Sequence, residues 1–178
     1  DAVKIITAYF DGEEDRLAAI EKEKAEKIEA VKKVKEEFAM QIEDEKAKAT
    51  SLPSGLKILT LKNGDGERPK VGQKVNVFYA GYLMDGTLFD SNYEEVARKY
   101  GTFDWNREQG GGYMAVPMDY SPESRLVAGF REALLTMKVG DKLRIFIPSH
   151  LGWGEQGTGP IPPNSDVVFD LEITGITN

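Results

Sequence analysis

The sequence predicts an α+β fold: an antiparallel sheet packed against one short helix, with a long helix ahead of both. Residues 13–49 consist mostly of Glu, Lys, Ala, Ile and Val without Gly or Pro, and these residue types favour a helix. Several later segments alternate apolar and polar residues as strands do. Only one short amphipathic helix interrupts these strands, without a strand–helix–strand rhythm, so the sheet should be antiparallel.

Composition narrows the classes of function. The 178 residues carry a net charge of −7, which argues against a nucleic-acid partner because phosphate binding needs a basic face. Cysteine is absent, which excludes disulfides, thiol nucleophiles and thiolate metal sites. With His150 as the one histidine, a His-based zinc site is not supported, and we expect neither a metal nor another cofactor. The length suits one domain plus an appendage.

The N-terminal helix is predicted to be an arm. Its Glu and Lys residues recur four positions apart, which supports a solvent-exposed helix. At 1.5 Å per residue the helix would be about 50 Å long. Two main interpretations stay open: a dimerisation arm or stalk, and a solvated helix packed partly on its own domain. Membrane-surface binding is the weakest alternative because the polar face is mixed in charge. The apolar residues form an interrupted stripe: Leu17, Ile20, Ile28, Val31, Phe38 and Ile42.

The folded domain is expected to occupy residues 53–178, and residues 1–52 are expected to form the arm and its linker. Pro53 stops the helix, and the composition changes there. Ahead of the helix, residues 1–10 fit either a strand or a helix turn capped by Asp1.

Residues 71–91 carry the clearest local signal, that of a β-hairpin. Apolar and polar residues alternate up to Tyr79, and an Asp-Gly turn at residues 85–86 leads into a second extended piece. This second piece presents Phe89 and Asp90. Two aromatic rings and a carboxylate on adjacent strands would line one concave wall.

Further strands are predicted at residues 56–61, 142–148 and 167–176, where apolar and polar residues alternate. A loop rich in Gly and Pro, residues 150–163, connects the last two. Residues 92–120 are predicted to be a long irregular insertion that begins with a turn or two of helix, and loops of this length are usually functional or disordered.

The aromatic residues Phe103 and Trp105 stand in an otherwise polar part of the insertion. Two interpretations stay open. Either they pin the loop to the surface, or they form a lip that captures a substrate.

The short helix is predicted at residues 125–137. Ser121 fits its N-cap, with a proline at the first position, and Gly140 fits a left-handed cap after its end. One face is apolar and should plug the sheet, whereas Arg131 and Glu132 should point away from it.

The order of several motifs in residues 55–178 resembles that of the FKBP-type peptidyl-prolyl cis/trans isomerases. The resemblance implies a five- or six-stranded antiparallel sheet wrapped around the short helix, with the substrate prolyl ring in the apolar hollow between them. The GxGxxG motif lacks the following helix that a dinucleotide site requires. The motifs are VxVxYxG, DGxxFDS, LVxGFxxAL, VGDKxxxxIP, GxGxxG followed by IPP, and VFDxE.

The resemblance also assigns the site residue by residue. The backbone N–H of Val127 would grip a substrate carbonyl, and Leu126 beside it would contact the substrate. Phe130 stands where many members have Trp, and Trp153 stands where many have Tyr. The long insertion leaves the remaining wall residue open between Tyr113 and Met114. The other pocket residues would be Tyr79, Phe89, Asp90, Ile161 and Phe169.

The implied activity is isomerisation of X-Pro bonds in proline-containing polypeptides, which assists protein folding. A dry apolar pocket favours the twisted amide, so no nucleophile, metal or general base is required, and Asp90 would act by electrostatics or by orienting Tyr79. The alternative function is a chaperone or polypeptide-binding module with the same fold and little isomerase activity.

Three further properties follow from the resemblance. Macrolide inhibitors would bind the pocket, and the N-terminal helix would support a homodimer or chaperone activity. Members that join such an arm to the catalytic domain favour a bacterial cell envelope or periplasm over the cytoplasm.

Overall fold

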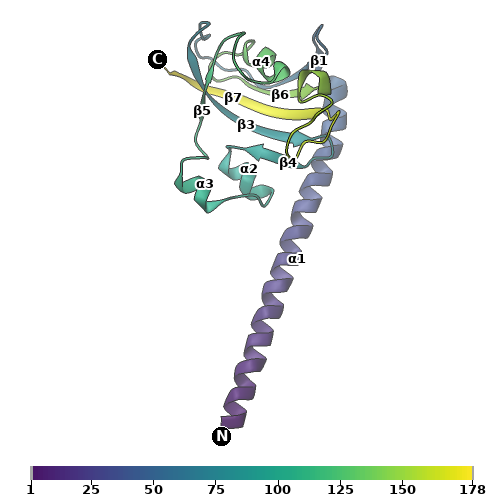
Figure 1. Ribbon diagram of the computed structural model, residues 1–178, viewed down its shortest axis with the longest axis vertical. Helices are drawn as coiled ribbons and strands as arrows, with labels where there is room; N and C mark the ends of the chain where they lie inside the picture. Colours follow the sequence, from purple (N-terminus) through teal and green to yellow (C-terminus); the bar gives the residue numbers. More distant parts are fainter. Residues whose placement is uncertain (1, 178) are drawn as a thin grey trace.

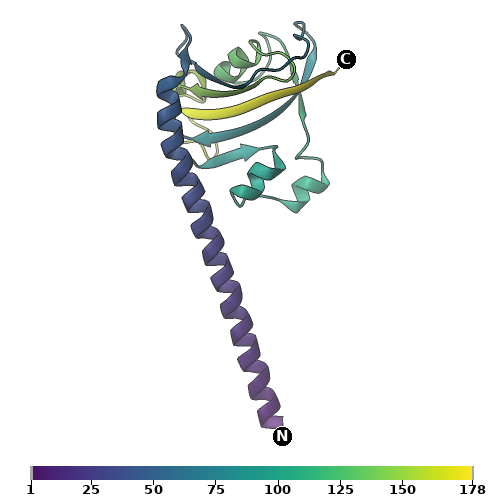
Figure 2. The ribbon, with the colours of Figure 1, turned by 180° about the vertical axis from the view of Figure 1, so that it is seen from behind.

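The computed structural model describes the backbone of residues 2–177 and the side chains of residues 12–177. The long helix α1 (Ala2–Lys48) projects far beyond a sheet domain (Figures 1 and 2). The predicted long helix is confirmed. It includes residues 2–10, for which the strand alternative is wrong, while the Asp1 cap lies outside the described residues. None of the described helices has an apolar stretch long enough to cross a membrane.

The sheet domain is built on one antiparallel sheet of seven strands, which confirms the predicted fold class but exceeds the expected five or six strands. The order across the sheet is β1-β2-β6-β7-β3-β4, and β5 also pairs with β3 (Figure 1). The strand number is higher because the two-residue strand β1 lies at one edge of the sheet. At the other edge, β4 and β5 pair with different parts of β3. The strands are β1 (Thr50–Ser51), β2 (Lys57–Lys62), β3 (Lys74–Leu83), β4 (Leu88–Ser91), β5 (Val116–Asp119), β6 (Lys142–Ile147) and β7 (Val167–Thr177).

Strands β4 and β5 share one edge of β3. Strand β5 pairs with residues 74–77 of β3, and β4 pairs with residues 80–82. Between them the chain leaves the sheet and forms α2 (Glu94–Lys99) and α3 (Trp105–Gln109), which lie together beside β4 (Figure 1). The predicted insertion is thus a two-helix excursion from a single sheet edge, and its first helix is where the sequence placed one.

A buried asparagine joins the two ends of this insertion to the sheet. The side-chain carbonyl of Asn92 accepts a hydrogen bond from the N–H of Tyr79 at 2.7 Å. Its amide group donates to the carbonyls of Val77 at 2.9 Å and Met114 at 3.0 Å. Both ends of the insertion are therefore tied to β3.

Helix α4 (Ala128–Leu134) packs its buried face against the sheet, as predicted. Its start is a correction, because the helix begins after Val127 and not at residue 125. Ser121 forms a turn instead of the helix cap, since its carbonyl accepts the N–H of Ser124. Gly140 has the expected left-handed φ of 91°, but it lies in the turn before β6 and not at the helix end.

Arg131 and Glu132, which were expected to point away from the sheet, bind protein groups outside the strands. Arg131 donates to backbone carbonyls on the approach to the helix. The carboxylate of Glu132 accepts from the hydroxyl of Ser54 at 2.7 and 2.9 Å. These contacts fix the helix to the segments around it.

The opposite face of the sheet is covered by the C-terminal part of α1. Phe38 and Ile42 are 8% and 0% exposed and pack in one cluster with Tyr82 and Phe146. The hairpin turn also abuts α1, since a Cβ on Gly86 would lie 2.2 Å from a backbone oxygen of α1. This part of the helix packs on the sheet domain. It bears out the interpretation of a helix that is packed partly on its own domain.

A buried ion-pair network joins α1 to the sheet. Arg144 on β6 binds both carboxylate oxygens of Asp170 on β7, at 2.6 and 2.8 Å, and Glu45 on α1 at 2.7 Å. Burial alone would lower the pKa of Arg144, but the hydrogen bonds and charges of Asp170 and Glu45 outweigh it and raise the pKa above its ordinary value. The arginine stays charged and connects three elements.

Candidate active site

A cavity of about 600 Å³ opens between the β3–β4–β5 edge, the start of α4 and the loop before β7. Most of its surface is apolar. Its lining includes every site residue assigned from the sequence except Tyr113 and Met114. Residues that lie far apart in the sequence, from the hairpin to the last strand, therefore meet at one hollow.

Phe169 on β7 lies at the centre of an aromatic floor. Its ring centroid is 5.4 Å from that of Phe89 and 5.3 Å from that of Phe130, both in edge-on contact, and 6.2 Å from that of Trp153. Gly81 on β3 permits this packing, because a Cβ there would lie 2.6 Å from the Phe89 ring and 2.7 Å from the Phe169 ring. Edge-on contacts between aromatic rings are favourable and directional. The floor is therefore a defined apolar surface.

The loop between η1 (Ser149–Leu151) and β7 forms another wall. Thr158 and Ile161 bond each other's backbones at 3.0 and 2.7 Å, which closes a tight turn. Ile161 is 4% exposed and joins the core, while Thr158 and Pro160 form the outer part of the wall. The predicted site residues of this loop, Trp153 and Ile161, thus face the same cavity.

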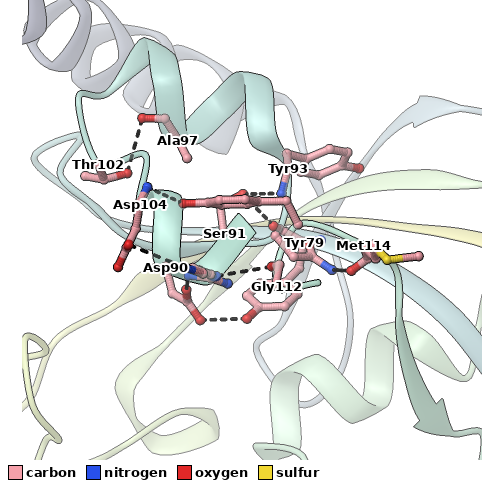
Figure 3. A network of polar contacts seen from close by, with 12 residues as sticks. Tyr79, Asp90, Ser91, Tyr93, Ala97, Thr102, Asp104, Gly112 and Met114 are labelled. Atoms are coloured by element: carbon pink, nitrogen blue, oxygen red, sulfur yellow. Dashed lines mark hydrogen bonds and ion pairs between the residues drawn. The ribbon is translucent and has the colours of Figure 1, made fainter. Parts of the chain in front are cut away.

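Both carboxylate oxygens of Asp90 accept a hydrogen bond from a neighbouring side chain. The hydroxyl of Tyr79 donates to one carboxylate oxygen at 2.6 Å, and the guanidinium of Arg107 donates to the other at 2.8 Å (Figure 3). Arg107 also donates to the carbonyl of Gly112 at 3.1 Å, which connects the insertion to the cavity. The carboxylate of Asp90 therefore connects the phenol of Tyr79 to the guanidinium of Arg107.

The phenol of Tyr79 stays neutral over an extended pH range. Burial is the main cause, and the hydrogen bond and charge of Asp90 add to it, so that the pKa rises to about 12. A tyrosine in an unfolded chain has a pKa of about 10. Because the folded pKa is the higher one, Tyr79 contributes stability that is complete below pH 10 and is lost as the pH rises towards 12.

We expect a Tyr79→Phe variant to reveal this titration. The difference in tyrosinate absorbance between the native protein and the variant should have its midpoint near pH 12, and near pH 10 when both are unfolded in urea. Stability should also fall less steeply above pH 10 in the variant. A native midpoint at pH 10 would show that the phenol of Tyr79 is neither buried nor bonded to Asp90 in solution.

Val127 offers a hydrogen-bond donor at the edge of the cavity. Its backbone is extended (φ −58°, ψ 146°), and its N–H bonds no other residue in the described part of the chain. Arg131 fixes this segment by donating to the carbonyls of Ser124 at 3.0 Å and Leu126 at 3.1 Å. A ligand carbonyl in the cavity would satisfy the N–H of Val127.

Tyr113 and Met114 lie outside the cavity, so their assignment to its wall is corrected. The hydroxyl of Tyr113 accepts the N–H of Asp104 at 2.9 Å, and Met114 is 66% exposed. Val116 and Met118 on β5 form that wall. They stand two residues apart on a strand, which is the spacing that puts side chains on one face. The predicted irregular insertion, residues 92–120, therefore extends too far, because β5 lies within it.

The two aromatic residues of the insertion have different environments. Phe103 stacks on Tyr113 with 5.2 Å between ring centroids, and the Arg98 guanidinium lies 3.8 Å from the Phe103 centroid. Trp105 touches Phe103 edge-on at 5.1 Å and is 66% exposed. The contacts of Phe103 hold the insertion together, whereas most of the Trp105 ring lies in solvent.

Comparison with known proteins shows the family of this chain. Residues 65–174 match the family model of the FKBP-type peptidyl-prolyl cis-trans isomerases. The chain is 34% identical to the FKBP-type peptidyl-prolyl cis-trans isomerase FkpA of Aeromonas hydrophila, over 90% of this chain and 53% of that protein. It is 36% identical to FK506-binding protein 1B of Neurospora crassa, over 68% of this chain and 98% of that protein.

A solved structure extends the similarity to the helix. The crystal structure of FkpA from Escherichia coli aligns with a TM-score of 0.57 and 28% identity, over 97% of this chain and 71% of that one. The chain spans about half the length of several curated relatives that it matches, including the Aeromonas protein and a macrophage infectivity potentiator of Trypanosoma cruzi. From the matched residues and the shared fold, the chain belongs to the FKBP-type peptidyl-prolyl cis-trans isomerase family.

Proposed function

We propose that this protein is a peptidyl-prolyl cis/trans isomerase that acts on proline-containing polypeptides and assists their folding. The observation that carries the proposal is the apolar cavity of about 600 Å³, floored by aromatic rings and edged by the unbonded N–H of Val127. Its two charged lining residues are Asp90 and Arg125, and both carboxylate oxygens of Asp90 accept a hydrogen bond. Such a cavity suits a reaction that breaks no covalent bond.

The physical basis is the loss of amide resonance during rotation. The barrier to X-Pro rotation, about 18–20 kcal/mol, reflects the partial double-bond character of the C–N bond. The twisted amide separates less charge than the planar one, so it loses less when water is removed. An apolar floor therefore stabilises the transition state more than the ground state, and this difference is what accelerates a reaction.

Each polar group in the cavity has a proposed role. The N–H of Val127 binds a substrate carbonyl and holds the peptide on one side of the rotating bond. The Asp90–Tyr79 pair, with a 2.6 Å hydrogen bond, fixes the phenol at the cavity wall. Phe130 and Trp153 shape the floor on which the prolyl ring rests.

The test is cis/trans exchange of blocked Ala-X-Pro-Phe peptides, measured by exchange NMR. We expect acceleration in proportion to protein concentration, with a preference among X residues. If the folded protein shifts the peptide resonances without accelerating exchange, the alternative applies, and the cavity belongs to a polypeptide-binding module or chaperone. The same cavity is proposed to take macrolide inhibitors, as the name of one relative, FK506-binding protein 1B, suggests.

The exposed part of α1 is proposed to form a homodimer. Residues 14–30 are exposed along their whole length, and Leu17, Ile20 and Ile28 are 49%, 37% and 70% exposed. These residues continue the stripe that is buried further along the same helix. An apolar stripe on an isolated helix gains stability when a second helix covers it.

We expect sedimentation to show a dimer that removal of residues 1–30 converts to a monomer. This truncation retains the part of α1 that packs on the sheet, so the domain should stay folded. Ile28→Glu should weaken the dimer in the full chain, whereas Glu29→Gln, on a neighbouring exposed position, should not. A truncated chain that sediments as the full chain does would exclude this role of the arm.

The organisms of similar chains bear on the cellular location. Similar chains occur in bacteria, among them Aeromonas hydrophila and Escherichia coli. We propose a bacterial cell envelope, as the resemblance to members with an N-terminal arm implies. Fractionation of the native cells would test it, and recovery in the cytoplasmic fraction would refute it.

A further inference from the structure

The rim of the cavity carries one uncompensated positive charge. Asp90 and Arg125 are its charged lining residues, and Asp90 already bonds Arg107 at 2.8 Å. Arg125 is exposed and forms no ion pair, hydrogen bond or cation–π contact with any residue between 12 and 177. An exposed arginine without a partner among residues 12–177 therefore lies in the lining of an apolar cavity, in a chain whose net charge is −7.

The backbone beneath this guanidinium is held in place. Arg131 donates to the carbonyls of Ser124 and Leu126, which lie on either side of Arg125, at 3.0 and 3.1 Å. The side chain itself can move, but its attachment point is fixed next to Val127. Glu123 is the nearest acidic residue along the chain, and it forms no ion pair with Arg125.

We propose that Arg125 selects polypeptides that carry a carboxylate side chain immediately before or after the proline. This inference rests on the proposed function, because it places the prolyl ring on the aromatic floor. The neighbouring side chains of the substrate then lie at the rim, within reach of a flexible arginine. A guanidinium binds a carboxylate through paired hydrogen bonds, and this one has no partner among residues 12–177 to give up.

The expected preference is modest because the arginine is exposed. An ion pair at an exposed site changes an equilibrium by about two- to five-fold, and the effect is screened by salt. The preference should therefore appear as a ratio of rates between matched peptides. Glu and Gln peptides are suitable, since they differ in charge and hardly in shape.

The test measures kcat/KM by exchange NMR for blocked peptides with Glu, Gln or Lys directly before or directly after proline. In the native protein we expect Glu to exceed Gln about three-fold at one of the two positions. The Glu-to-Gln ratio of kcat/KM should fall to about one in Arg125→Gln. In Arg125→Glu, the Lys peptide should react faster than the Glu peptide. The Glu-to-Gln ratio of the native protein should also approach one in 1 M NaCl, where the Debye length is about 3 Å.

A matched control separates local from overall charge. Arg68 is exposed and outside the cavity lining, so Arg68→Gln changes the net charge equally and should keep the three-fold ratio. Equal Glu-to-Gln ratios in the native protein and Arg125→Gln, at both positions, would overturn the inference.

A protein without isomerase activity would refute the proposed function but would still decide the inference. The same peptides are then titrated by protein NMR shifts. Tighter binding of the Glu peptide that Arg125→Gln abolishes would support the selection, and equal affinities of the Glu and Gln peptides would overturn it.

Discussion

Replacing Phe169 with alanine is expected to lower kcat/KM for X-Pro isomerisation by at least about ten-fold, a loss of about 1.4 kcal/mol of transition-state stabilisation. The ring forms edge-on contacts with Phe89 and Phe130 and lies beside Trp153. Removing it opens the floor to water, which restores the solvation of the planar amide. Because the residue is 5% exposed, the free energy of unfolding should also fall by about 3–5 kcal/mol.

Phe146→Ala is the matched control for this loss of stability. Phe146 lies on the neighbouring strand, is 3% exposed, and packs in the cluster on the other face of the sheet with Phe38. Its removal should cost similar stability and leave kcat/KM nearly unchanged at a temperature where both variants stay folded. A folded Phe169→Ala protein with native kcat/KM would contradict the assignment of the floor, as would an equal loss of activity in Phe146→Ala.

Replacing Arg144 with alanine is expected to lower the free energy of unfolding by about 3–5 kcal/mol. Its side chain is 12% exposed, and it neutralises Asp170 and Glu45, whose side chains are 10% and 18% exposed. The variant leaves the Asp170 carboxylate buried without its cation. Urea unfolding gives the loss, and amide hydrogen exchange should quicken in the part of α1 near Glu45.

An exposed ion pair provides the comparison for Arg144. Lys74 and Asp119 form a pair at 3.0 Å with both side chains 57% exposed, so Lys74→Ala should cost at most about 1 kcal/mol. Adding Asp170→Asn to Arg144→Ala should recover part of the stability, because it removes the unpaired charge. Equal costs for Arg144→Ala and Lys74→Ala would show that the network is too hydrated to hold α1 on the sheet.

The hairpin was predictable because its signals are local. Alternation up to Tyr79 and the Asp-Gly turn predict two paired strands. A register shift between Gly81 and Tyr82, which the sequence did not predict, places Asp90 opposite Gly81. Gly86 has the left-handed φ of 88° that such a turn requires. The contact of Tyr79 with Asp90 follows from this register.

Features that depend on distant contacts were not predictable. Arg107 reaches Asp90 only because the insertion leaves and rejoins the same sheet edge, and nothing in the local sequence marks that return. The Ser-Pro sequence at residue 121 matches a helix start, yet the carbonyls of Ser124 and Leu126 bond Arg131 and delay the helix. Local preference yields here to contacts made by the folded chain.

The long helix shows the same limit. Its apolar stripe indicated that another surface covers it. The stripe alone does not say which of its residues pack on the sheet of the same chain. Phe38 and Ile42 are buried against the sheet, whereas Ile28 on the same stripe is 70% exposed. The packing ends near Val34 and Lys35, where the turn between β3 and β4 lies against the helix.

One NMR sample tests most directly whether the cavity is a prolyl isomerase site. Isotope-labelled protein mixed with an excess of a blocked Ala-Leu-Pro-Phe peptide reports both peptide exchange and the protein resonances. We expect accelerated cis/trans exchange, with shifts at the N–H of Val127 and at the rings around Phe169. Exchange at the uncatalysed rate with a folded protein, or catalysis that leaves Val127 and these rings unshifted, would contradict the site described above.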